Sequence, residues 1–233
     1  MNGFRDIHAH FVYGVDDGAR TRADMEAMLD AAHADGVASL FATPHVTPGI
    51  APFDERLFHA RLAEARGYCA ERGYPLTLYA GAEILYTPAM ERYASEHRLP
   101  TLADSEYVLM EFVPDIAYVE LDATLGQLER SGYTAILAHI ERYRCMSLKN
   151  AYRLKEKYDI CYQINCGTLL RKQRFFKAHR VERWLKDELI DFVATDSHDT
   201  LRRPSRMTAA YECLRQHVKP DYAMRLVGLG TDR

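Results

Sequence analysis

Short apolar runs alternate along this chain with longer stretches in which apolar residues recur every three or four positions. The first long stretch places apolar side chains at the i, i+3, i+4, i+7 spacing of one helix face, at Met25, Met28, Leu29 and Ala32. Thr21 and Asp24 form a variant of the capping box at its start, and Gly36 is suited to its end. The pattern predicts a helix between Thr21 and Gly36.

Further helices and strands follow from the same two patterns. Helical spacing recurs in the stretches 58–73, 121–132, 148–157, 176–188 and 205–217. The opening segment "DIHAH" is the first predicted strand. Apolar runs between the helices predict six more strands, VASLFATPH (37–45), LTLYAGAE (76–83), YVLMEF (107–112), YTAILAH (133–139), ICYQIN (160–165) and DFVATD (191–196).

Strands that alternate with helices pair in parallel through right-handed crossovers. Seven strands at this spacing favour a closed or nearly closed barrel over an open sheet. No glycine-rich phosphate loop follows the first strand, which counts against a dinucleotide-binding sheet. We predict an α/β fold, a distorted seven-stranded (β/α)7 barrel, in a single domain that spans residues 1–233.

Composition narrows the class of protein. The net charge is -3, so bulk nucleic-acid binding is not expected, and no stretch approaches the roughly 18 uncharged apolar residues that a membrane helix needs. Polar residues occupy the region where a signal peptide would have its apolar segment, which predicts a cytoplasmic protein. The five cysteines form no C-x-x-C pair, so a disulfide framework or a structural zinc knuckle is not expected.

Residues able to bind a metal follow the ends of most predicted strands. They are His8, His10, His45, Glu83, Glu111, His139, Asn165, Asp196 and His198, and Asp17 lies on the loop after the first strand. The carboxyl ends of parallel barrel strands converge on one mouth, where active sites lie. Carboxylates crowded there would repel one another and lose hydration, and metal ions would remove both penalties. We therefore expect a metal site at this mouth.

The remaining histidines provide an internal control. They fall within or near predicted helices, at His33, His59, His97, His179 and His217. We interpret them as surface or packing residues. Half of the ten histidines are thus segregated to strand ends, which supports the site more than their number does.

The motifs "DIHAH…GVDDGA", "ATPH", "GAEI", "EF", "AHIERY" and "ATDSH" occur in an order and spacing that resemble the polymerase and histidinol phosphatase (PHP) superfamily. Within it the chain looks most like bacterial capsule-type protein-tyrosine phosphatases. The resemblance runs from Asp6 to about Met207. It implies a distorted seven-stranded barrel with three metal ions, manganese in these enzymes. It also implies a partner, the phosphotyrosine-bearing tail of a bacterial tyrosine kinase that acts in capsule or exopolysaccharide synthesis.

The resemblance also implies a ligand set. One ion would be held by His8, His10, Glu83 and Asp196; the second by Glu83, Glu111 and His139; and the third by Asp17, His45 and His198. Asp16 has no ligand role in this mapping and is expected to shape the turn with Gly18. The nitrogen and oxygen ligands fit manganese, iron and zinc alike. Such a site would attract a phosphate dianion and activate water to hydroxide.

Two arginines lie shortly after expected ligands, Arg142 three residues after His139 and Arg203 five residues after His198. Arginine grips phosphate through paired hydrogen bonds, and the resemblance supports that role for both. Arg144, Arg202 and Arg206 receive no role beyond a positive rim. Tyr143 is suited either to stack on a substrate ring or to pack in the core.

Rival functions remain open at this stage. A cysteine-dependent phosphatase needs C-x5-R spacing, and the nearest approach, Cys166 to Arg171, is one residue short. The same metal site could serve a small phosphoester such as histidinol phosphate. A third hypothesis is a metal-bound regulator of the kinase without catalysis, which the complete ligand set argues against. The sequence is compatible with a homo-oligomer.

Overall fold

The strands of this protein form two parallel sheets. The computed structural model describes residues 3–170 and 175–229, with side chains for all of these except 175–179. The described residues contain the strands β1 (Phe4–Ala9), β2 (Val37–Ala42), β3 (His45–Val46), β4 (Thr77–Ala80), β5 (Glu83–Leu85), β6 (Tyr107–Glu111), β7 (Thr134–Leu137), β8 (Ile160–Asn165) and β9 (Phe192–Ala194). One sheet has the order β1-β2-β4 and the other β3-β5-β6-β7-β8-β9. All of these pairings are parallel, so the predicted parallel α/β fold is confirmed.

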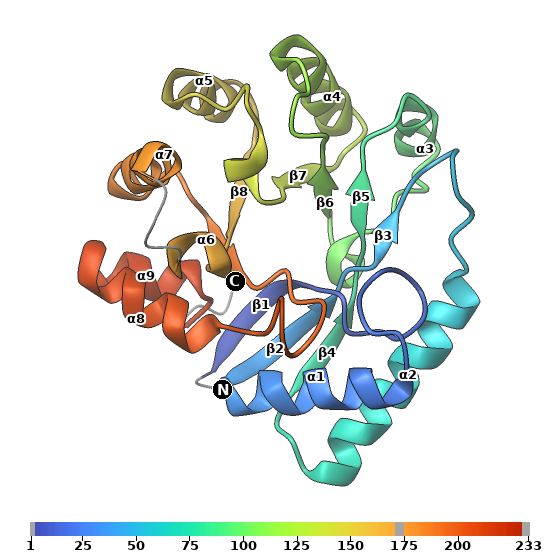
Figure 1. Cartoon of the computed structure of the whole chain (residues 1–233). Coiled ribbons are helices and arrows are strands. Elements are labelled where there is room, and N and C mark those ends of the chain that lie inside the picture. The colour runs from blue at the N-terminus through green and yellow to red at the C-terminus, as the bar shows by residue number, and fades with distance from the viewer. Residues whose placement is uncertain (1–2, 171–174, 230–233) are drawn as a thin grey trace.

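The helices surround the strands, as Figure 1 shows. Those within the described residues are α1 (Arg22–Ala34), α2 (Glu55–Arg72), α3 (Met90–Ser95), α4 (Tyr118–Arg130), α5 (Leu148–Lys157), α6 (Cys166–Leu170), α7 (Phe175–Lys186), α8 (Met207–His217) and α9 (Pro220–Leu226), with 3-10 turns at Leu102–Asp104 and Ile140–Arg142. None of the helices in the described ranges is long and apolar enough to cross a membrane.

Two predicted strands are each divided into two in the structure. The segment 37–45 contains β2 and the start of β3, separated at Thr43 and Pro44, and 76–83 contains β4 and the start of β5. Pro44 has no N–H to donate to a neighbouring strand, but its carbonyl accepts the N–H of Glu83 at 3.0 Å. The chain therefore changes sheet at these two points, which periodicity within the sequence does not show.

The two sheets also approach each other at β1 and β9. Ala9 and Ser197 form an isolated parallel bridge. On either side of it, the N–H of Asp196 donates to the carbonyl of His8 at 2.8 Å, and the N–H of His10 to the carbonyl of Ser197 at 2.8 Å. The first strand and the segment after the last one are thereby held together, with three candidate site residues, His8, His10 and Asp196, at this seam.

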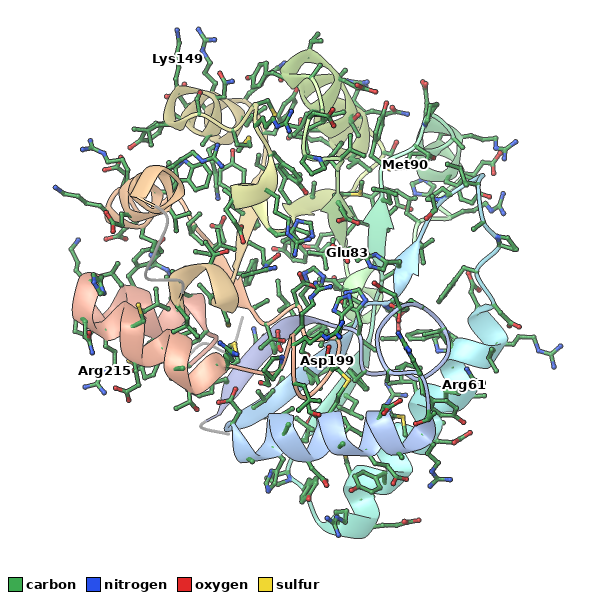
Figure 2. The ribbon with its side chains drawn as sticks, in the orientation of Figure 1. Arg61, Glu83, Met90, Lys149, Asp199 and Arg215 are labelled. Atoms are coloured by element: carbon green, nitrogen blue, oxygen red, sulfur yellow. The ribbon has the colours of Figure 1, made fainter. Side chains whose placement is uncertain are left out.

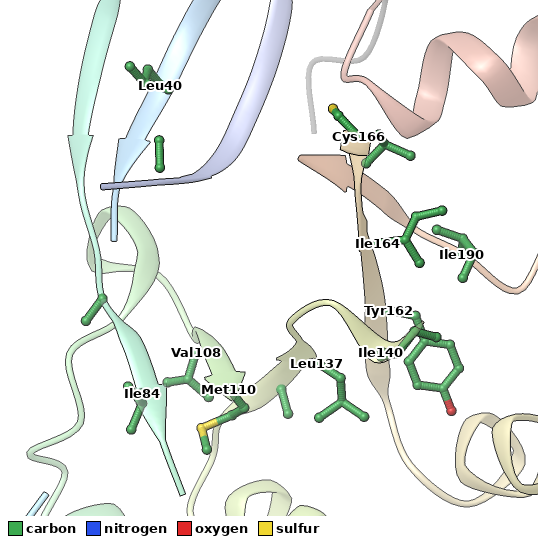
Figure 3. Packing of buried hydrophobic residues seen from close by; sticks show 14 of the residues in the cluster. Leu40, Ile84, Val108, Met110, Leu137, Ile140, Tyr162, Ile164, Cys166 and Ile190 are labelled. Carbon is green, nitrogen blue, oxygen red and sulfur yellow. The ribbon is translucent and has the colours of Figure 1, made fainter. Parts of the chain in front are cut away.

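Apolar side chains form two layers. The larger cluster packs the strands against the surrounding helices, and Figure 3 shows part of it around β7 and β8, including Leu137, Ile140 and Tyr162. A smaller cluster joins Ala138, which follows β7, to side chains from β1, β6, β7, β9 and the first 3-10 turn, namely Ile7, Leu109, Ile136, Ala194 and Leu102. Strands of both sheets therefore share this inner cluster.

The long helices lie where the periodicity predicts them. Thr21 and Asp24 form both hydrogen bonds of the capping box at the start of α1. Gly73 ends α2 in the left-handed conformation, with φ of 68°. The short helices α3, α6 and α9 were not predicted, because five to seven residues hold too few turns for a helical period to appear in the sequence.

Candidate metal centre

The side chains predicted as metal ligands lie in the strands or on the segments that follow them. His8 is in β1, His45 and Glu83 begin β3 and β5, and Glu111 ends β6. His10 follows β1, His139 follows β7, and both Asp196 and His198 follow β9. Asp17 lies on the loop before α1. Figure 2 shows Glu83 at the centre of the ring of helices, whereas Lys149 and Arg215 point outward from it.

A first cluster consists of His8, His10, Glu83 and Asp196, the four residues predicted to share one ion. One potential ligand atom from each lies within 4.8 Å of the others. His8 Nε2 lies 3.1 Å from Glu83 Oε2, and His10 Nε2 lies 3.3 Å from the same oxygen. All four side chains are buried. Two imidazoles and two carboxylates thus face one another out of contact with solvent.

A second cluster contains His10, Asp17, His45 and His198. It includes the three residues predicted for another ion and adds His10. The Nε2 atoms of His45 and His198 each lie 3.4 Å from Asp17 Oδ1. The Nε2 atom of His198 is buried and has no hydrogen-bond partner among the described residues. A buried nitrogen with an unused lone pair is suited to a metal ion.

The third cluster differs from the prediction in one member. It contains His45, Glu83 and Glu111, where the resemblance implied His139. His139 Nε2 nevertheless lies 2.7 Å from Glu83 Oε1 and 3.5 Å from Glu111 Oε1. His139 also has a positive φ of 34°, an unusual backbone conformation that its surroundings must maintain. Glu83 is close to both histidines and belongs to two clusters.

The protonation equilibria of these groups reflect their crowding. Burial would raise the pKa of Glu83, but attraction to His8 and hydrogen bonds with His10 and His139 outweigh it and hold this pKa well below its usual range. Burial and repulsion from Glu83 raise the pKa of Glu111. Burial, His10 and Arg203 lower the pKa of His198 to about 4. Burial would lower the pKa of His8 and His10, but the neighbouring carboxylates outweigh it and raise both, that of His10 to about 10. A divalent ion would displace these protons, because neutral imidazoles and ionised carboxylates are the forms that bind it.

Asp16 orients two of the histidines. Its Oδ1 atom accepts the N–H of Gly18 at 3.0 Å, which confirms its predicted role in the turn. Its Oδ2 atom lies 2.7 Å from His10 Nδ1 and accepts the N–H of His45 at 3.2 Å. The backbone and side chain of His10 lie so close to Gly18 that a Cβ there would clash. A carboxylate on Nδ1 leaves Nε2 of His10 for a metal.

Gln163 plays a similar part on β8 and was missed by the sequence analysis. Its Oε1 accepts the N–H of His139 at 2.7 Å and lies 3.3 Å from His8 Nδ1. Its Nε2 donates to Asn165 Oδ1 at 2.8 Å, and Asn165 Nδ2 donates to Asp196 Oδ2 at 2.6 Å. Gln163 and Asn165 are two residues apart and so face the same side of the strand, which is the one sequence signal that connects them.

Arg142 and Arg203 meet at the same carboxylate. The Nη2 atom of each lies 2.6 Å from Asp196 Oδ2. Both side chains are 39% exposed, so they border the buried cluster on its open side. Asp199 holds the loop that carries Arg203, because its Oδ1 accepts the N–H groups of Leu201, Arg202 and Arg203. Two guanidinium groups beside the clusters can bind the oxygens of a phosphate.

Two other residues receive a clear assignment. Tyr143 is fully buried; its hydroxyl donates to the carbonyl of Ala138 at 2.7 Å and accepts the N–H of Phe112. It is therefore a packing residue and cannot stack on a substrate. Burial raises the pKa of Cys166 well above its usual value, so this thiol is not a nucleophile. Arg171, its sequence neighbour in the rejected motif, lies outside the described residues.

Comparison with known proteins agrees with this geometry. Residues 4–230 match the family model described as "Capsular polysaccharide synthesis, CpsB/CapC". The chain is 32% identical over 216 residues to the tyrosine-protein phosphatase CpsB of Streptococcus pneumoniae, which covers 90% of this chain and 88% of that one. It is 29% identical over 204 residues to the tyrosine-protein phosphatase YwqE of Bacillus subtilis, with coverage of 85% and 78%.

Solved structures show the same relationship. A crystal structure from work on YwqE and CpsB, described as unique metal-dependent tyrosine phosphatases, matches with a TM-score of 0.86 at 27% identity and covers 96% of this chain and 91% of that one. The histidinol phosphate phosphatase of Lactococcus lactis matches with a TM-score of 0.60 at 14% identity and covers 94% of each chain. The second match indicates a shared fold.

Proposed function

Because this chain belongs to the capsular polysaccharide synthesis CpsB/CapC family, we propose that it is a metal-dependent protein-tyrosine phosphatase. Family membership confirms the resemblance inferred from the motifs. The observation that carries the proposal is the set of overlapping histidine and carboxylate clusters with two arginines at its open side. The substrate is phosphotyrosine on a bacterial tyrosine kinase of capsule or exopolysaccharide synthesis.

The proposal includes three divalent ions, with manganese as the first choice and iron or zinc as alternatives. His8, His10, Glu83 and Asp196 would hold one ion, Glu83, Glu111 and His139 a second, and Asp17, His45 and His198 the third. When bound, such ions neutralise charge on phosphoryl oxygens and lower the pKa of water at the site. The overlapping clusters support this assignment, and Glu83 is the ligand that two ions would share.

The protein's own groups bind and orient the substrate. Arg142 and Arg203 would hold the non-bridging phosphoryl oxygens, as their guanidinium groups hold Asp196 in this structure. Asp16 and Gln163 keep the rings of His10 and His8 in place. A tyrosinate leaving group, with a pKa of about 10, needs less protonation than an alkoxide. Aryl phosphates are therefore the substrates that this site should hydrolyse most readily.

Turnover of two substrates tests the proposal. In added manganese, the purified protein should hydrolyse a phosphotyrosine peptide with a much higher kcat/KM than histidinol phosphate. A chelator should abolish this activity and manganese should restore it, whereas alkylation of the thiols should leave it intact. Faster turnover of histidinol phosphate than of the peptide would mean that the substrate is a small phosphoester and not phosphotyrosine. Activity that survives chelation would overturn the metal mechanism.

Elemental analysis tests the number of ions. Protein supplemented with metal should contain three ions per chain, and a reproducible content of one or fewer would exclude the trinuclear site.

The proposal also includes the finer predictions on fold and location: one domain, a seven-stranded PHP-type barrel and a cytoplasmic location. The bridge between Ala9 and Ser197 and the inner cluster shared by both sheets support the barrel.

A further inference from the structure

A pocket of about 260 Å³ lies beside the candidate metal centre. His45 belongs to both: its ring nitrogens face Glu83 and Asp17, and the residue also lines the pocket. Val15, from the loop that carries Asp16 and Asp17, forms part of the wall. The pocket is thus the immediate neighbour of the clusters on the side of His45, whereas Arg142 and Arg203 adjoin Asp196.

Five of the nine residues that line this pocket have apolar side chains. Besides His45, the lining includes Val15, Ala51, Pro52, Phe53 and Leu57. Asp54 is the one lining residue with a carboxylate, and its Oδ1 accepts the N–H of Leu57 at the start of α2. Neither lysine nor arginine lines the pocket. The five apolar side chains offer contacts to an apolar group, and a carboxylate without a lining cation disfavours a phosphate or another anion.

Several contacts fix the pocket in shape. The carbonyl of Thr47 accepts the N–H groups of Ile50 and Ala51 at 3.1 and 3.2 Å. The hydroxyl of Thr87 donates to the carbonyl of Pro48 at 2.7 Å, and the rings of Phe53 and Phe58 pack with centroids 5.5 Å apart. A preformed wall costs a ligand little conformational entropy, so it can contribute to recognition.

We propose that this pocket binds an apolar side chain of the peptide substrate, two positions from the phosphotyrosine; this rests on the proposed function. The volume is below the 300–1,000 Å³ of typical small-molecule sites and suits one aliphatic or aromatic side chain. In an extended peptide, side chains two residues apart lie on the same side, about 6–7 Å from each other. One can therefore enter the metal centre while the other enters the pocket beyond His45.

Matched phosphotyrosine peptides test this inference. Two series carry Leu, Ser or Glu at the second residue before or after the phosphotyrosine, with all other positions identical. In one of the series, the wild-type protein should show a kcat/KM at least about tenfold higher for Leu than for Ser, with Glu the poorest. Since each value is a ratio measured on one preparation, differences in metal content or in the folded fraction cancel.

Variants assign the preference to the pocket. Leu57→Glu places a carboxylate in the wall, and Ala51→Phe fills the space from an exposed loop, so each should bring the Leu-to-Ser ratio close to one. Val119→Glu adds the same charge on α4, outside the pocket, and should keep the wild-type ratio. Peptide turnover with a ratio near one in the wild type, or a ratio that survives in both pocket variants, would overturn the pocket assignment alone. Failure to hydrolyse any phosphotyrosine peptide would overturn the proposed function and this inference with it.

Discussion

Histidines occupy two contrasting regions of this molecule. At the strand ends, the imidazoles of His8, His10, His45, His139 and His198 all lie within 4 Å of carboxylate oxygens, and all but His45 are buried. In the helical shell, His33 stacks on Tyr74 with centroids 4.0 Å apart, and the exposed His217 lies 2.7 Å from the carbonyl of Cys213. His59 and His97 are also exposed.

The difference shows that topology, and not residue type, creates the site. A histidine on a helix can keep contact with water, so it needs no special partner. Histidines at the carboxyl ends of parallel strands are driven together by the fold, and their burial is costly without compensation. Metal binding to the five of them supplies that compensation in our proposal.

Removal of one histidine from each region gives the largest expected difference. His139→Ala should lower kcat/KM on a phosphotyrosine peptide by more than about a thousandfold, since a group that acts with its neighbours as a unit is lost. His33→Ala should stay near wild type, because it removes only a ring contact with Tyr74. Circular dichroism should show both variants folded. Equal activity of the two would remove the case for the strand ends as the site.

The sequence predicted this segregation because the apolar runs show where the strands end, and parallel pairing brings those ends to one mouth. Eight of the nine predicted ligands belong to the three clusters, and His139 lies 2.7 Å from Glu83; their role as metal ligands stays a prediction. The sequence did not predict the division of the strands at Pro44, which depends on how the chain passes between the two sheets. Nor did it predict that His45 lies near Glu83 and Glu111 as well as near Asp17, because that proximity depends on the relative displacement of neighbouring strands.

Arg203→Ala tests whether the positive side of the mouth binds phosphate. The variant should keep its metal but lose about thirty- to a thousandfold in kcat/KM, because a charge-assisted contact worth about 2–4 kcal/mol is lost. Arg203→Lys should recover part of this, since it keeps the charge without the planar guanidinium. An alanine variant with full metal and undiminished kcat/KM would leave Arg142 as the phosphate ligand.

Gln163→Met tests a smaller contribution from β8, a strand with no residue in the three-ion ligand set. The change removes the contacts with His139 and His8 at similar volume. Loss of such an outer partner should weaken metal affinity by about ten- to a hundredfold, and excess manganese should restore much of the activity. Gln216→Met on the exposed side of α8 is the matched control. Unchanged affinity in a manganese titration would make Gln163 a packing residue only.

Gln163 and Asp16 also mark the limit of sequence analysis within the site. Both act on ligands through hydrogen bonds to ring nitrogens or to backbone N–H groups. A glutamine in an apolar strand gives no chemical signal of its own, because its partners come from residues that are distant along the chain. Such roles depend on side-chain directions that only the folded structure provides.

Asp6→Asn should have the smallest effect on turnover, although Asp6 lies two residues from His8. Its carboxylate is buried and accepts the hydroxyl and the N–H of Thr195, at 2.5 and 3.0 Å, across the β1–β9 seam. Burial raises its pKa from 3.8 to about 6, an effect that these hydrogen bonds only partly offset. An asparagine can keep both contacts, because the hydroxyl can accept from the amide. We therefore expect kcat/KM within about threefold of wild type.

The informative measurement on Asp6→Asn is the pH dependence of stability. Between pH 4 and 6 the unfolded wild type releases the Asp6 proton before the folded protein does, so the folded state binds more protons and its stability falls as the pH rises. A shift of about two pKa units corresponds to about 3 kcal/mol. Asparagine lacks this titration, so the free energy of unfolding of the variant minus that of wild type should rise by roughly that amount from pH 4 to 7. Urea unfolding of both proteins in chelator gives this difference, in which the unchanged histidines and carboxylates of the mouth cancel. If the difference in the free energy of unfolding between variant and wild type did not change with pH, Asp6 would be ionised at little cost. Burial at the seam would then not distinguish Asp6 from the carboxylates of the mouth.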